Sequence, residues 1–204
     1  MNLTTHNMKT VYLLFSFTII LIGMSLGQND TLPFKEIPPA PETFTAGTVA
    51  GRMIDALGFR YYWATKDLRA EDLSYKPSKD SRSARETLEH LYGLSETIVN
   101  APQQLPNIRP ATIDWATLTF DELRRMTLEN IKKASELVKQ SEGNMEDYKV
   151  IFKRGENQAD FPYWNMLNGP IADALTHVGQ IVSFRRASGN PIYPGVNVFM
   201  GTTN

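Results

Sequence analysis

The stretch IADALTHVGQIVSFRRASG, residues 171–189, decides how the C-terminal part of this sequence folds. Its apolar periodicity predicts one amphipathic helix, in which residues four apart lie on the same face. Four side chains share the face that should meet neighbouring helices, at spacings of four, four and three: Asp173, His177, Ile181 and Phe184. The helix therefore carries a carboxylate and an imidazole beside its apolar stripe, where a surface helix normally has neither.

A carboxylate in that position needs a partner, because a buried ionised group is costly unless it is paired or bound to a metal. Asp173 and His177 offer two ligands from one helix, and His90, on the flank of another predicted helix, can complete a three-residue site. Two histidines and one carboxylate suit a divalent ion such as Zn, Ni, Fe or Mn. The residues also allow a simpler interpretation, an Asp173–His177 ion pair with His90 as an ordinary surface residue.

Three further amphipathic segments precede this helix. Two of them open with capping boxes, Ser83 with Glu86 and Thr119 with Glu122. The predicted helices cover approximately residues 48–68, 83–102, 119–140 and 162–187. Four such helices joined by loops predict an all-α fold, a four-helix bundle.

Two features lie just before the fourth helix and at its start. Residues 148–162 are expected to form a short strand or an irregular hairpin, because residues 150–152 are β-prone and Gly155 can turn. Tyr163 and Trp164 then open the last helix. They could wall a cavity above Asp173, although packing alone also explains them.

Composition excludes several classes of function. The chain has 204 residues, 42% of them hydrophobic, which is enough for a core. Its formal net charge of -1 gives no sign of a nucleic-acid partner. Cysteine is absent, so disulfides, thiolate metal sites and cysteine nucleophiles are excluded.

The N-terminus has the pattern of a secretory signal peptide. A lysine at position 9 precedes an apolar run over residues 11–22, and small residues follow up to Gly27. A membrane anchor is the alternative, but the run is shorter than the roughly 20 residues of a membrane span. We therefore expect a signal peptide at 1–27, an extended proline-containing lead-in at 28–44 and one domain at 45–204. The expected location is secreted or periplasmic, with no membrane association after cleavage.

Two segments resemble a known family. LSYKPSKDSRSARETLEHLYGL, residues 73–94, and NGPIADALTHVGQIVSFRRASGNP, residues 168–191, are similar to sequences of the DinB-like superfamily of metalloenzymes, also called DinB/YfiT-like. The resemblance covers about residues 45–192 and implies a helical bundle with a metal bound by three histidines. In the family one histidine comes from the second helix and two come from the last helix. The matching positions are His90, Asp173 and His177, so an aspartate stands at the first position of the pair on the last helix. Homodimers are common in the family, but no apolar stripe in this sequence specifies one.

The resemblance leaves two classes of function open. One is a metal-dependent enzyme, a hydrolase or a thiol-dependent transferase, that acts on an unidentified small molecule. The other is a non-catalytic helical-bundle binding protein in which Asp173 and His177 form a structural pair.

The first prediction concerns export. Because residues 8–27 combine a charge, an apolar run and small residues, N-terminal sequencing of the exported protein should begin at or near Gln28. Recovery of the intact leader in the membrane fraction would contradict the secreted location.

Overall fold

The computed structural model describes residues 32–141 and 145–204, so the predicted signal peptide lies outside the described residues. Four long helices dominate the domain: α1 (Ala46–Thr65), α3 (Ala84–Asn100), α4 (Phe120–Lys139) and α6 (Ala172–Ala187). Two short helices accompany them, α2 (Ala70–Ser74) and α5 (Trp164–Met166). In these residues no helix is both long and apolar enough to cross a membrane.

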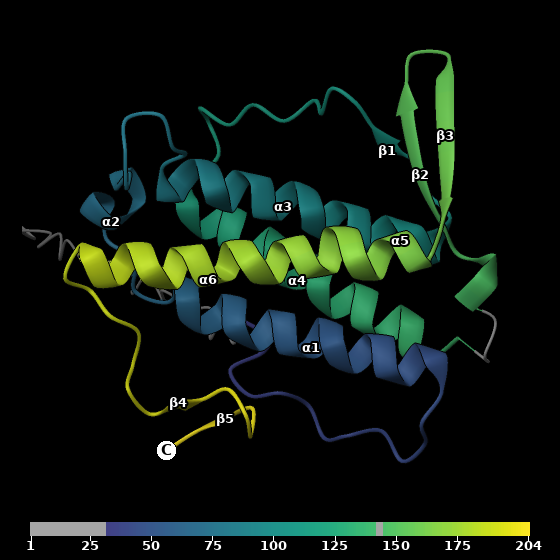
Figure 1. Cartoon of the computed structure of the whole chain (residues 1–204), viewed down its shortest axis with the longest axis horizontal. Helices are drawn as coiled ribbons and strands as arrows, with labels where there is room; N and C mark the ends of the chain where they lie inside the picture. The colour runs from purple at the N-terminus through teal and green to yellow at the C-terminus, as the bar shows by residue number, and fades with distance from the viewer. Residues whose placement is uncertain (1–31, 142–144) are drawn as a thin grey trace, which may run out of the picture. The chain divides into compact units, whose positions relative to one another are not determined.

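The long helices enclose one hydrophobic core. Helix α6 packs against both α1 and α3, and α4 packs against the same two helices from the other side (Figure 1). Each helix contributes fully buried aliphatic side chains, among them Ile54, Leu57, Leu88, Ile98, Leu123, Leu128, Ile131 and Ile181. Burial of these apolar surfaces is the main stabilising contribution.

The predicted all-α four-helix bundle is wrong as a fold class, because the structure also contains two β-sheets. The strands are β1 (Asn107–Ile108), β2 (Lys149–Arg154), β3 (Asn157–Pro162), β4 (Val196–Asn197) and β5 (Thr202–Thr203). The first three form one sheet in the order β1-β2-β3, and the last two form an antiparallel pair.

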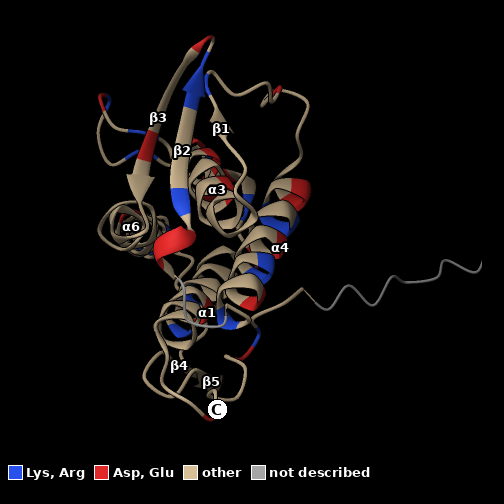
Figure 2. Ribbon diagram, turned by 90° about the vertical axis from the view of Figure 1, so that its right-hand side faces the viewer, with Lys and Arg blue, Asp and Glu red and all other residues tan. Residues whose placement is uncertain are grey.

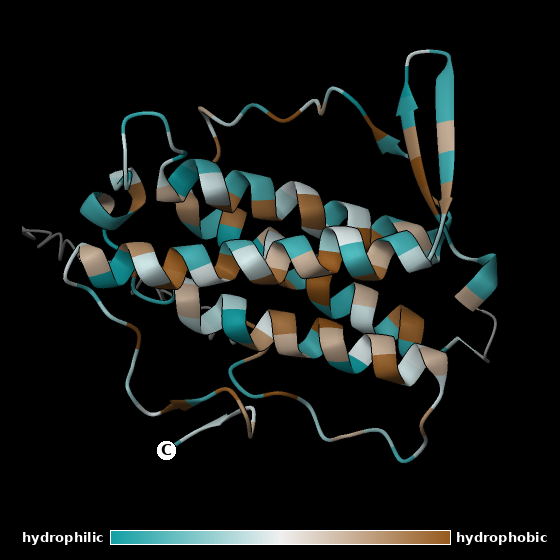
Figure 3. Cartoon of the chain, in the orientation of Figure 1, coloured by the Kyte–Doolittle hydropathy of each residue, from teal (hydrophilic) through white to brown (hydrophobic). Residues whose placement is uncertain are grey.

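The larger sheet combines a local and a distant pairing. Strands β2 and β3 form the hairpin expected at residues 148–162, with Gly155 at a φ of 57° in the turn. Its tip is hydrophilic, whereas β2 is apolar where it reaches the helices (Figure 3). Strand β1 pairs in parallel with β2 and places Asn107 opposite Phe152. The buried Asn107 amide also donates to the Ile151 carbonyl at 2.9 Å. No local periodicity indicates this contact, and for that reason the all-α prediction missed it.

Helix boundaries follow local chemistry closely. Both predicted capping boxes are present, at the starts of α3 and α4. The first helix ends at Thr65, earlier than predicted, because Lys66 is extended and Asp67 has a φ of 59°.

The predicted last helix is interrupted. A π-helical turn, Leu167–Ile171, separates α5 from α6 and contains Pro170. Proline lacks the N–H that an α-helix would use there, and its ring clashes with the preceding turn, so the wider turn accommodates it.

The buried guanidinium of Arg185 ties the end of α6 to the end of α1. The residue is 3% exposed, and its Nη1 donates to the carbonyls of Trp63, Ala64 and Lys66 at 2.9–3.1 Å. Its Nε donates to the Asn190 carbonyl at 2.6 Å. Carbonyls in the last turn of a helix have no intrahelical partner, so Arg185 satisfies three groups that would otherwise be unpaired.

The carboxylate of Asp72 adds α2 to the same junction. It is 1% exposed and accepts hydrogen bonds from the Arg69 guanidinium, the Ser188 hydroxyl at 2.5 Å and the Asn190 amide at 2.6 Å. These donors, above all Arg69, lower the pKa of Asp72 far below its usual range despite the opposing effect of burial.

We expect Arg185→Ala to lower the free energy of unfolding by about 3 kcal/mol or more, because it leaves several buried carbonyls unpaired. Arg186→Ala is the matched control: the residue is exposed, so the change should stay within about 0.5 kcal/mol. Urea denaturation measures both. Equal midpoints for the two variants would show that the Arg185 junction contributes little.

The Asp72 carboxylate should also make the free energy of unfolding depend on pH in the acidic range. Its pKa is lower in the folded than in the unfolded state, so its contribution is complete above the unfolded pKa of about 4 and is lost as pH falls below it. Asp72→Asn should therefore be less stable than the wild type at pH 7, and the difference should shrink between about pH 5 and pH 2. Thermal unfolding across this range tests the prediction, and a difference that does not vary with pH would refute it.

Candidate metal site

The structure brings all three predicted ligand residues together. His90 lies on α3, and Asp173 and His177 lie one turn apart on α6, which packs against α3. One potential ligand atom from each residue can be chosen so that all three lie within 4.8 Å of one another. The group could hold a metal ion.

The Asp173 carboxylate lies between the two imidazoles. Its Oδ2 is 3.2 Å from His90 Nε2, and its Oδ1 is 3.3 Å from His177 Nε2. The two rings are perpendicular, with an interplanar angle of 89° and centroids 4.6 Å apart. Each carboxylate oxygen therefore faces one histidine nitrogen.

These distances suit a shared ion. Zinc ligands lie about 2.0–2.2 Å from the metal, so two ligands in a tetrahedral arrangement are roughly 3.3–3.6 Å apart. The nitrogen–oxygen distances of 3.2 and 3.3 Å are close to that range. They also match hydrogen bonds between histidine and aspartate, so either a metal ion or a proton fits between these atoms.

Gln180 bears on which ring nitrogen of His177 carries the proton. Its Oε1 is 2.8 Å from His177 Nδ1, and because an amide oxygen can only accept, a hydrogen bond here requires the tautomer with the proton on Nδ1. In a neutral His177, the lone pair of Nε2 then faces Asp173 Oδ1, and two acceptors meet at 3.3 Å. Only a cation between them, either an added proton or a metal ion, makes this contact favourable. A second hydrogen bond of this kind is typical of histidines that bind metals.

The site is partly open to solvent. The Asp173 side chain is 45% exposed and that of His177 is 14% exposed. Burial is the largest influence on the pKa of His90 and lowers it. The hydrogen bond to the Asp173 carboxylate opposes this shift, and the positive charge of Arg82 adds to it. His90 is therefore neutral at pH 7, which is the form that can bind a metal. The exposed side leaves room for water or a substrate.

One hydrogen-bond partner in the site was not predicted from the sequence, and two aromatic residues line a cavity away from Asp173 and not above it. Gln180 follows His177 by three residues, so the spacing that places side chains on one helix face could have indicated it. Tyr163 and Trp164 do line a cavity, but its α6 residues are Ala172 and Leu175. At 100° per residue Leu175 lies about 160° around α6 from both Asp173 and His177.

Comparisons with known proteins found no relative. The sequence matches no protein-family model, and searches of curated proteins and of solved structures gave no match.

Proposed function

We propose that this protein belongs to the DinB-like superfamily and uses a divalent metal ion bound by His90, Asp173 and His177. The observation that carries the proposal is the Asp173 carboxylate between two Nε2 atoms, with Gln180 Oε1 at 2.8 Å from the other ring nitrogen of His177. Residue types and the resemblance both offered these three positions as a set, and the contact between α3 and α6 supports a shared chemistry for them.

The ligand set limits the choice of ion. Two imidazole nitrogens and one carboxylate suit Zn, Ni, Fe(II) or Mn, whereas Mg and Ca prefer oxygen ligands alone. The ion would supply Lewis-acid chemistry, which serves hydrolysis as well as transfer to or from a thiol. Asp173 and His177 would hold it from α6, His90 from α3, and Gln180 would keep His177 in the ligating tautomer.

The substrate in this proposal is a small molecule outside the cytoplasm, in keeping with the predicted signal peptide. A nucleic-acid substrate is disfavoured, because the formal net charge is -1 and basic and acidic residues are mixed along the ribbon of α4 (Figure 2).

The alternative is a non-catalytic binding protein in which the same residues form a structural cluster. One observation favours it: an Nε2 atom of each histidine lies within ion-pair distance of the Asp173 carboxylate, at 3.2 and 3.3 Å. In that case Asp173 would be neutralised by protonated histidine, and the cluster would only join α3 to α6.

Metal binding by the purified protein, prepared without a histidine tag, decides between these functions. We expect one Zn or Ni ion per chain by calorimetric titration at pH 7.5. His177→Ala should abolish binding, and Asp173→Asn should weaken it because the negative charge is lost while the shape is kept. Asp173→His should keep or strengthen affinity for both ions, since imidazole suits each. Binding should fail as pH falls through the histidine pKa, ordinarily about 6.5, because a protonated imidazole cannot ligate.

Two controls make this test specific. Gln180→Ala should weaken binding about tenfold, because it frees the His177 tautomer without removing a ligand. Ser183→Ala, an exposed change further along α6, should have no effect. If the wild type takes up no ion at pH 7.5, the structural-cluster alternative holds instead.

A further inference from the structure

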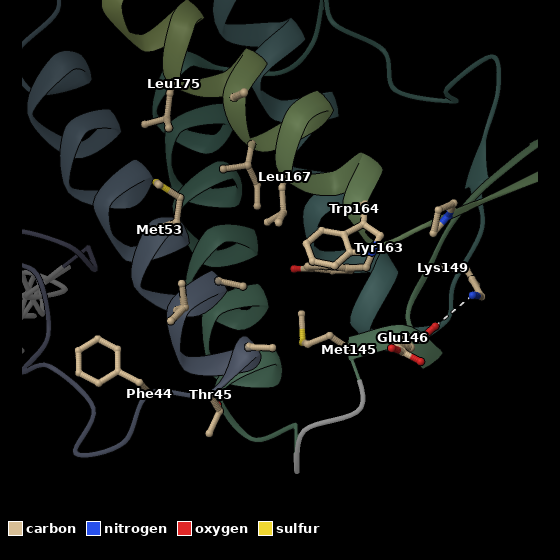
Figure 4. A pocket seen from close by; sticks show the side chains of 16 residues that line it. Phe44, Thr45, Met53, Met145, Glu146, Lys149, Tyr163, Trp164, Leu167 and Leu175 are labelled. Carbon is tan, nitrogen blue, oxygen red and sulfur yellow. Dashed lines mark hydrogen bonds between the residues drawn. The ribbon is translucent and has the colours of Figure 1, made fainter.

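The cavity lined by Tyr163 and Trp164 lies on the other side of α6 from the candidate metal site. It has a volume of about 730 Å³, between the N-terminal half of α1 and the segment from β3 to the start of α6. Its walls are mainly apolar and include Val49, Met53, Tyr163, Trp164, Leu167 and Leu175 (Figure 4). Pockets for small organic ligands have volumes of roughly 300–1,000 Å³ and a similar lining.

The hydroxyl group of Tyr163 points into this cavity (Figure 4). The residue is only 5% exposed, and its hydroxyl has no hydrogen-bond partner among the described residues. Buried polar groups almost always have a partner, so an unpaired hydroxyl that faces a cavity indicates a missing one. Burial raises the pKa of Tyr163 above its ordinary value, so the hydroxyl keeps its proton and can donate.

The rim of the cavity exposes large apolar side chains. Trp164 is 75% exposed, Phe44 is 95% exposed, and Val49 and Met53 are about half exposed. Apolar groups gathered around a cavity are typical of binding sites, whereas single exposed ones are ordinary. Several elements supply them here, so the apolar character belongs to the cavity as a whole.

The charges near the cavity do not favour an ionised ligand. Lys149 and Glu146 line one end, and the Lys149 ammonium donates to the Glu146 carbonyl at 3.0 Å. The two side chains carry opposite charges, and in Figure 4 the Lys149 ammonium lies away from the Tyr163 hydroxyl. The remaining lining is mainly apolar, and the Tyr163 hydroxyl is its buried donor without a hydrogen-bond partner among the described residues.

We propose that this cavity binds a neutral, largely apolar small molecule whose carbonyl oxygen accepts a hydrogen bond from the Tyr163 hydroxyl. The site is independent of the metal, because its α6 residues face α1 while Asp173 and His177 face α3. Apolar burial supplies most of the affinity, and the tyrosine selects molecules that carry an acceptor.

Titration with 2-nonanone, followed by NMR of ¹³C-labelled methionine methyl groups, tests the proposal. Met53 and Met145 line the cavity, so their methyl signals should shift and saturate. Met126 and Met200 lie outside it and should stay unchanged. Tyr163→Phe should bind the ketone about fivefold to tenfold more weakly, which is the effect of one hydrogen bond.

Three further variants test whether ketone binding depends on this cavity in particular. Tyr61→Phe removes the hydroxyl of another buried tyrosine, outside the cavity, and should leave ketone binding unchanged. Ala172→Trp should fill the cavity and abolish binding. His177→Ala should bind the ketone normally, which distinguishes this site from the metal site. The thermal midpoint of Tyr163→Phe should be equal to or above that of the wild type, because an unpaired hydroxyl is removed.

Several results would overturn the proposal. One is the absence of saturable shifts at Met53 and Met145. Another is an unchanged ketone affinity in Tyr163→Phe. A third is a shift of the same methyl signals with protein concentration alone, which would show that a second copy of the chain covers the cavity.

Discussion

The buried guanidinium of Arg185 is the interaction on which the rest of the structure depends. It satisfies three carbonyls at the end of α1 from a position near the end of α6, and Asn190 and Asp72 complete the junction. Burial of a charge is tolerated only where every donor has a partner, so this junction allows one relative position of the two helices along their axes. The position of α6 along the bundle in turn places Asp173 and His177 opposite His90 on α3.

Helix α6 contributes side chains to two different sites because it packs against both α1 and α3. The side toward α3 carries the carboxylate and the imidazole, and the side toward α1 contributes apolar walls to a cavity of about 730 Å³. The π-helical turn at Leu167–Ile171 comes directly before α6 and changes the rotation of α6 relative to α5. Wider turns of this kind are often found at functional sites, and here the turn contributes Leu167 and Ile171 to the cavity.

The aspartate at position 173 makes the charge of the candidate metal site different from that of a site with three histidines. A set of three histidines is neutral, whereas this set carries one negative charge and two oxygens that each face a histidine nitrogen. The carboxylate raises the attraction for a divalent ion and also for protons on the neighbouring imidazoles. Metal and proton therefore compete for the same position, which links the metal-binding hypothesis to its structural-cluster alternative through one measurable equilibrium.

The sequence by itself determined the features that depend on neighbours in the chain. The capping boxes at Ser83 and Thr119, the hairpin around Gly155 and the shared face of Asp173 and His177 all follow from spacings of a few residues. For His90 the residues indicated a helix flank from which it could complete a site with Asp173 and His177, and resemblance to a family gave the same three positions. Only the tertiary structure decided the pairing of β1 with β2, the role of Arg185 in capping α1, and the side of α6 on which Tyr163 lies. The physical reason is that periodicity specifies which side chains share a face, whereas packing between distant segments sets how the helices are rotated and shifted against one another.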